Sequence, residues 1–174
     1  VNITINSVND SPVINAASTI AVNENTTAVG TISASDVEGD SLVLTLDGTD
    51  ASSFELSSSN ALSFITAPDF ETKTSYSLTF SVTDGSLTSS KDITINIINL
   101  NDVAPEFTSS SSYSAAENQT SVGTAKATDV EGDTLTYSIS GTELAITSTG
   151  LITFKSAPDF ESKTSYTASV TVSD

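Results

Sequence analysis

The 174-residue chain carries 22 acidic side chains against 5 basic ones, and its net charge of −17 opposes binding to nucleic acid and to anionic membranes. Cysteine and histidine are both absent, which excludes a disulfide framework, ordinary zinc sites and histidine-based catalysis. No apolar run approaches the roughly 20 residues of a membrane-spanning helix, so we expect no membrane insertion by this segment.

The chain opens with a short predicted strand, residues 1–8, in which Val1, Ile3 and Ile5 alternate with polar residues. Residues 1–6 resemble residues 93–98, so we interpret the segment as the last strand of a preceding repeat in a longer polypeptide. The alternative is that it completes the second domain of another copy. Such a head-to-tail contact would not close and would build a filament.

Residues 9–98 predict the first domain. Period-two alternation with one apolar face indicates half-buried strands of antiparallel sheets, and clusters of Ser, Thr, Asn, Asp and Gly separate them. Nothing in the sequence has helical spacing. The seven predicted strands lie near residues 13–22, 28–35, 41–47, 53–57, 61–66, 75–83 and 90–98.

A linker, residues 99–104, precedes the second predicted domain, residues 105–174. The six predicted strands of this second domain lie near residues 106–115, 121–128, 134–140, 143–147, 150–154 and 164–173. The predicted fold class is therefore all-β, with two tandem seven-strand Greek-key β-sandwiches of which the second lacks its own last strand.

The two domains repeat short acidic motifs. Residues 34–40, ASDVEGD, return as ATDVEGD at 127–133, and residues 67–71, APDFE, return unchanged at 157–161. Asp36 and Asp129 are 93 residues apart, a period that corresponds to a whole domain. Clusters of carboxylates are typical ligands of calcium, which takes six to eight oxygen atoms.

These motifs, in this order, resemble those of cadherin repeats, in particular the cadherin-like tandem repeats of bacterial surface and adhesin proteins. The segments concerned are Glu-Asn at 24–25 and 117–118, Asp-Val-Glu at 36–38 and 129–131, Asp-Phe-Glu at 69–71 and 159–161, Val-Thr-Asp-Gly at 82–85 with Val-Ser-Asp at 172–174, and the linker at 99–105. Asn99 and Val103 depart from the family pattern, which implies fewer or weaker ions than the three per junction that are usual in the family.

The resemblance implies Ca²⁺ as the cofactor and assigns its ligands. One complete site would lie at the junction, with the Leu100 and Val103 backbone nearby. Its ligands would be Glu24, Asp69, Glu71, Asn99, Asn101, Asp102, Asp129, Glu131 and Asp174. An upper half-site would hold Asn9, Asp10, Asp36, Glu38 and Asp84, and a lower half-site would hold Glu117, Asp159 and Glu161. Asp40 and Asp133 are either further ligands or turn residues, because Gly-Asp is common in turns.

We therefore expect a non-enzymatic, extracellular or cell-surface spacer or adhesion module that calcium stiffens. Its expected partners are neighbouring repeats, with other copies of the chain, a surface protein or a glycan as further candidates. The alternative functions are a filament subunit joined through residues 1–8 and a carbohydrate-binding module. The second alternative needs an exposed aromatic row, and aromatic residues form only 6% of the chain.

Overall fold

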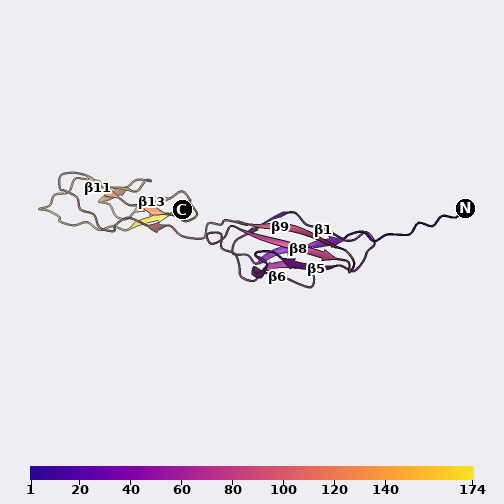
Figure 1. Ribbon diagram of the computed structural model, residues 1–174. Helices are drawn as coiled ribbons and strands as arrows, with labels where there is room; N and C mark the ends of the chain where they lie inside the picture. Colours follow the sequence, from indigo (N-terminus) through magenta and orange to yellow (C-terminus); the bar gives the residue numbers. More distant parts are fainter. The chain divides into compact units, whose positions relative to one another are not determined.

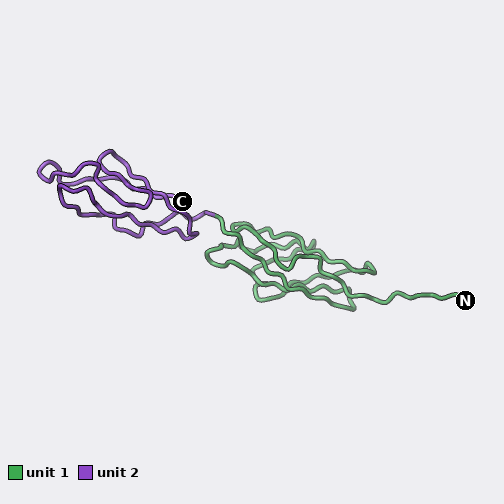
Figure 2. The backbone as a smooth tube through the Cα atoms, turned by 90° about the horizontal axis from the view of Figure 1, so that it is seen from above, with its two compact units in different colours: residues 1–100 green, residues 101–174 purple.

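The computed structural model describes residues 1–174, which divide into two compact units, Val1–Leu100 and Asn101–Asp174 (Figure 2). Both units consist of strands and loops, with a single 3₁₀ turn at Ala51–Ser53. No helix has the length and apolar content that crossing a bilayer requires.

The strands of unit 1 are numbered in chain order, and Figure 1 labels β1, β5, β6, β8 and β9 among them. They are β1 (Val13–Asn15), β2 (Thr19–Asn23), β3 (Ala28–Thr31), β4 (Ser33–Ser35), β5 (Val43–Asp47), β6 (Phe54–Leu56), β7 (Ala61–Phe64), β8 (Ser75–Thr83) and β9 (Thr88–Ile98). Four of them form a sheet in the order β2-β9-β8-β5, and three form a sheet in the order β3-β7-β6, while β1 pairs with β4. The all-β prediction is confirmed.

The longest strands, β8 and β9, supply much of the core of unit 1. Leu78, Phe80 and Val82 alternate with more exposed residues along β8, and Ile93, Ile95 and Ile97 do the same along β9. Each alternate side chain faces the opposite sheet, as the two-residue period of a strand dictates. The other buried members of this core are Ile14, Val22, Ile32, Phe54, Leu62 and Phe64.

The strand expected over residues 13–22 is divided in the structure. Val13–Asn15 pairs antiparallel with β4, whereas Thr19–Asn23 pairs in parallel with β9. The chain crosses from one sheet to the other between them, and each half therefore satisfies its backbone groups in a different ladder. Continuous alternation in the sequence could not reveal this change of sheet.

The strands of unit 2 are shorter. They are β10 (Glu106–Phe107), β11 (Ser121–Thr124), β12 (Ala127–Thr128), β13 (Thr136–Ile139), β14 (Leu144–Ile146), β15 (Leu151–Phe154) and β16 (Val170–Ser173). The buried apolar residues of this unit are Ala125, Ile152 and Pro158. Phe160, in the second Asp-Phe-Glu motif, is 60% exposed, whereas its equivalent Phe70 packs against the core of unit 1.

Two predicted strands of unit 2 are truncated, and the same cause explains both. Of residues 106–115 only Glu106–Phe107 is a strand, and of residues 164–173 only Val170–Ser173. In unit 1 the equivalent segments pair with β9, and no strand of unit 2 takes that place. These segments therefore lack the ladder of hydrogen bonds to a strand like β9 that holds their equivalents in unit 1 extended.

Candidate metal centres

Glu24 lies at the end of β2 and is the most buried acidic residue of unit 1, with 1% of its surface exposed. Its Oε2 accepts the backbone N–H of Phe70 at 2.9 Å, and its Oε1 accepts that of Leu100 at 2.6 Å. Asn25 follows in the left-handed conformation with φ 60° and donates its N–H to the carbonyl of Pro68. One carboxylate therefore fixes both the Asp-Phe-Glu loop and the start of the linker.

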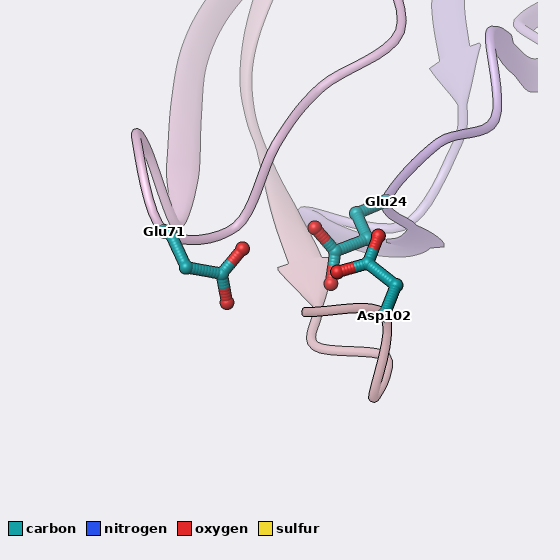
Figure 3. Close-up of side chains that lie close together, drawn as sticks. All are labelled: Glu24, Glu71 and Asp102. Carbon is teal, nitrogen blue, oxygen red and sulfur yellow. The ribbon is translucent and has the colours of Figure 1, made fainter. Parts of the chain in front are cut away.

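Carboxylate oxygens of Glu24, Glu71 and Asp102 lie within 4.8 Å of one another. Figure 3 shows these side chains, with Glu71 on its own loop and Asp102 in the linker two residues beyond Leu100. Three carboxylates this close repel one another unless a cation or protons neutralise them. The motif resemblance places all three in one site, and the structure brings them together.

Asp69 lies outside this cluster and organises its own loop. Its Oδ1 accepts the N–H of Glu71 at 3.1 Å, and its Oδ2 accepts the hydroxyl of Thr72 at 2.7 Å. The Thr72 hydroxyl is the main cause of a lowered pKa at Asp69. The motifs did not single out Thr72, although a hydroxyl recurs at the same position in the second copy as Ser162.

The Asp-Val-Glu loop of unit 1 folds around Asp36. Its Oδ1 accepts the backbone N–H groups of Glu38, Gly39 and Asp40 at 3.0, 3.1 and 3.2 Å. Its second oxygen, Oδ2, is buried and has no hydrogen-bond partner. Asp40 thus contributes at least its backbone to the turn.

The other residues of the upper half-site lie beside this loop. Glu38 Oε2 accepts the N–H of Asp10 at 3.2 Å, and the Asn9 side chain donates to Asp84 Oδ2 at 2.8 Å. The N–H groups of Leu87 and Ser86 are the main causes of a lowered pKa at Asp84, and Asn9 contributes to it. The structure therefore joins Asn9 to Asp84 and Asp10 to Glu38, in two pairs at one end of the sandwich.

Unit 2 repeats the upper arrangement with its own residues. Asp129 Oδ1 accepts the N–H of Asp133 at 3.1 Å, and Glu131 Oε1 accepts the N–H of Val103 at 2.9 Å. Asp102 also donates its N–H to Glu131, at 3.4 Å. Glu38 and Glu131 thus accept backbone N–H groups from equivalent segments, each of which precedes the first strand of its sandwich.

The lower end of unit 2 brings together Glu117, Asp159 and Glu161, whose carboxylate oxygens also lie within 4.8 Å of one another. Glu117 Oε2 accepts the N–H of Phe160 at 3.3 Å, as Glu24 does with Phe70. The Ser162 hydroxyl is the main cause of a lowered pKa at Asp159. All three residues are exposed, in contrast to Glu24.

Four oxygens in these loops and in the linker are buried without a hydrogen-bond partner. They are Asp36 Oδ2, Asn99 Oδ1, Asp129 Oδ2 and Glu131 Oε2. All four belong to residues that the motif resemblance assigns as ligands. A buried acceptor without a partner costs about 1–3 kcal/mol, and a hard cation bound there would supply the missing interaction. Asn101 and Asp174, also assigned as ligands, are exposed in the structure.

Comparisons with known proteins show which family and which folds this architecture resembles. A family model described as bacterial Ig domain matches residues 9–96. No curated protein is similar in sequence.

Solved structures with a similar fold include two-domain and longer cadherin fragments. Human protocadherin-24 EC1-2 has 19% identity and a TM-score of 0.73, over 95% of this chain and 94% of that one. Mouse cadherin-23 EC22-24 has 23% identity and a TM-score of 0.70, over 87% of this chain and 56% of that one. Drosophila N-cadherin EC1-4 has 21% identity and a TM-score of 0.73, over 95% and 48%. The chain thus has a cadherin-like fold, and it belongs to the bacterial Ig domain family.

Proposed function

We propose that the chain is a spacer or adhesion module of an extracellular bacterial repeat protein, and that Ca²⁺ bridges its neighbouring sandwiches. The observation that carries this proposal is the set of buried, unpartnered oxygens in the acidic loops and linker. Hydrogen-bonded loops hold these oxygens in place, yet leave them without a donor. A divalent cation would remove the free-energy cost of burying acceptors without a partner.

The chemistry of the donors favours calcium over other metals. The candidate ligands are carboxylates and amide or backbone carbonyls, and the chain has neither His nor Cys. Zinc and copper prefer nitrogen and sulfur ligands, and magnesium demands a more rigid octahedron with several waters. Calcium accepts a flexible cage of six to eight oxygens, which several loops and a linker are able to provide together.

The linker is the element through which an ion would act on both units. Within unit 1 its first residues are held by Glu24, which binds the Leu100 N–H. Within unit 2 its following residues are held by Glu131, which binds the Val103 N–H. An ion that takes oxygens from these loops and from Asp102 would tie the linker at both ends and restrict the hinge.

Without the ion, electrostatic repulsion would act in the opposite sense. Two unit charges 4.8 Å apart, the span of the cluster at Glu24, repel by about 1 kcal/mol in water and more at a partly buried position. The net charge of −17 adds to this effect. Calcium would therefore convert a flexible string of domains into a stiffer rod, as a long surface protein requires to present its far end.

A calcium titration with metal analysis and thermal unfolding tests the proposal. We expect saturable binding and a rise in the melting temperature that EDTA reverses. Asp102→Asn should reduce the number or affinity of ions, whereas Asp47→Asn, which removes the same charge from an exposed position of β5, should not. Equal binding by both variants, or no binding by the wild-type chain, would contradict the proposal.

A further inference from the structure

Lys73 closes the turn that carries the candidate ligands Asp69 and Glu71. Its backbone N–H donates to the Asp69 carbonyl at 2.9 Å, and the Thr72 hydroxyl donates to Asp69 Oδ2 at 2.7 Å. Figure 3 shows the Glu71 side chain turned from this loop toward Glu24. The position of the turn therefore determines how closely Glu71 approaches the other carboxylates of the cluster.

The side chain of Lys73 joins this turn to the sandwich of unit 1. Its Nζ lies 2.5 Å from Asp50 Oδ1 and 4.6 Å from the centre of the Tyr76 ring. Asp50 immediately precedes the 3₁₀ turn, and its Oδ2 accepts the N–H of Ser77 in β8 at 2.8 Å. Only 15% of the Asp50 side chain is exposed. The lysine thus reaches from the turn to an acid that β8 holds in place.

Tyr76 is also held in place by the sandwich. Its ring packs edge-on against Phe54 and Phe64, with centroid distances of 5.5 and 5.0 Å, and both phenylalanines belong to the buried core. A cation over the face of such a ring is attracted to it. The Lys73 side chain is 41% exposed, and an ion pair at that exposure would hold a turn only weakly by itself. The acid and the ring together restrain the ammonium group on two sides.

Unit 2 has the same arrangement. The Lys163 N–H donates to the Asp159 carbonyl at 2.9 Å and closes the turn that carries Asp159 and Glu161. Its Nζ lies 2.7 and 2.6 Å from the two carboxylate oxygens of Glu143, and 4.3 Å from the centre of the Tyr166 ring. Each sandwich therefore joins its Asp-Phe-Glu turn to its own acid and its own tyrosine through one lysine.

The acid occurs in both units although the loop that carries it differs in length. In unit 1, Gly-Thr-Asp at 48–50 is followed by the 3₁₀ turn Ala51–Ser53 and then by β6. In unit 2, Gly-Thr-Glu at 141–143 is followed directly by β14, with no residues equivalent to that turn. The glutamate side chain is one methylene longer than aspartate. Two different loops thus bring a carboxylate to the same lysine, which connects the contact with the turn that both units share.

We propose that Lys73 and Lys163 are positioning residues for the calcium sites, and that each holds its Asp-Phe-Glu turn where the glutamate meets the other carboxylates. This inference rests on the proposed function. Without an ion, repulsion between Glu71 and the rest of its cluster favours movement of the turn away from Glu24. The contacts of Lys73 oppose that movement, so that ordering the turn costs less free energy when Ca²⁺ binds.

Positioning and simple charge predict opposite effects of removing Lys73. A lysine that acted only through its charge would repel Ca²⁺, and its removal would tighten binding. A lysine that holds the turn strengthens binding, and its removal weakens binding. Because the charge of Asp50 balances that of Lys73, we expect the positioning effect to be the larger one.

A calcium titration followed through the amide NMR signals of the two Asp-Phe-Glu turns reports on each site separately. Lys73→Met keeps the length of the side chain without its charge, and should weaken binding at the turn of unit 1 by about 10-fold. Binding at the turn of unit 2 should not change, and Lys163→Met should have the converse effect. Lys73→Arg, which retains the charge for the carboxylate and the ring, should bind nearly as the wild type does.

Two controls separate the contact from the charge. Lys126→Met removes one positive charge from an exposed position outside both turns, and should leave the affinity of both turns nearly unchanged. Asp50→Asn should weaken binding at the turn of unit 1, and adding Lys73→Met to it should have little further effect, because both substitutions remove the same contact.

Hydrogen exchange in EDTA tests the turn without the metal. In Lys73→Met, the amide of Phe70, which donates to Glu24, should exchange faster than in the wild type, while the amides of β8 and β9 should not. Faster exchange throughout β8 and β9 would indicate general loss of structure and would overturn the positioning role.

The proposal is also overturned if Lys73→Met binds calcium as tightly as the wild type or more tightly, or if the exchange of the turn does not change. Failure of the proposed function gives a different result. In that case the wild-type chain binds no calcium, and the positioning role falls with it. Failure of the positioning role alone leaves equal binding by the wild type and by Lys73→Met.

Discussion

Replacing Glu24 with alanine separates the structural role of this residue from its role as a metal ligand. The side chain is 1% exposed and accepts two backbone N–H groups, from Phe70 and Leu100. Its loss leaves two donors without a partner in a partly buried place, at about 1–3 kcal/mol each. We therefore expect Glu24→Ala to destabilise unit 1 by about 2–6 kcal/mol even in EDTA. For a domain of this size, that loss lowers the melting temperature by roughly 10–30 °C.

The matched control is Glu71→Gln, because Glu71 belongs to the same cluster but is exposed. In EDTA this variant should melt close to the wild type, and in calcium it should gain less stability than the wild type does. Calorimetry of both variants, with and without calcium, gives the comparison. If Glu24→Ala melts like the wild type in EDTA, the two backbone hydrogen bonds do not hold the loop and linker as described.

Three further predictions concern single positions. Phe80 is fully buried in unit 1, so Phe80→Ala should lower the free energy of unfolding by about 3–5 kcal/mol. The equivalent Val170→Ala, in the more exposed core of unit 2, should lower it clearly less. Equal losses in urea unfolding would contradict this difference between the two cores. The pKa of Asp84 lies below its ordinary 3.8 because its carboxylate accepts hydrogen bonds from Leu87, Ser86 and Asn9. These bonds stabilise the folded loop above pH 3.8, and this stabilisation is lost as the pH falls through the lowered pKa of the folded state. Asn9→Ala should raise the pKa of Asp84 in a carbon-detected NMR titration, and an unchanged pKa would refute the contact. Gly48 has φ +109°, and an added Cβ would lie 2.8 Å from the Thr79 nitrogen, so Gly48→Ala should lower the melting temperature of unit 1. Gly85 also has a positive φ, but an added Cβ would meet no atom within 4 Å. Gly85→Ala should therefore lower the melting temperature less.

Local patterns in the sequence predicted most of the architecture of unit 1. The alternation of Leu78, Phe80 and Val82 with polar residues identified the core face of β8, because this two-residue period can be read within the strand's own sequence. The division of the first strand could not be predicted in the same way. Whether residues 13–22 stay in one sheet depends on where β4 and β9 lie, and these are distant in the sequence.

The candidate metal centres show the same limit. Repetition of the Asp-Val-Glu and Asp-Phe-Glu motifs predicted which loops carry acids, and Glu24, Glu71 and Asp102 do lie together. The sequence did not distinguish Glu24, which binds two backbone N–H groups, from Asp69, which binds within its own loop. That distinction depends on how the end of β2, the Asp-Phe-Glu loop and the linker contact one another. These segments are distant in the sequence and meet only in the folded domain.

The most direct test of calcium bridging is ¹⁵N relaxation of the two units, measured in EDTA and in saturating calcium. We expect EDTA to give each unit its own, shorter rotational correlation time, and saturating calcium to bring both units to a single, longer one. Correlation times that calcium leaves unchanged would contradict calcium bridging.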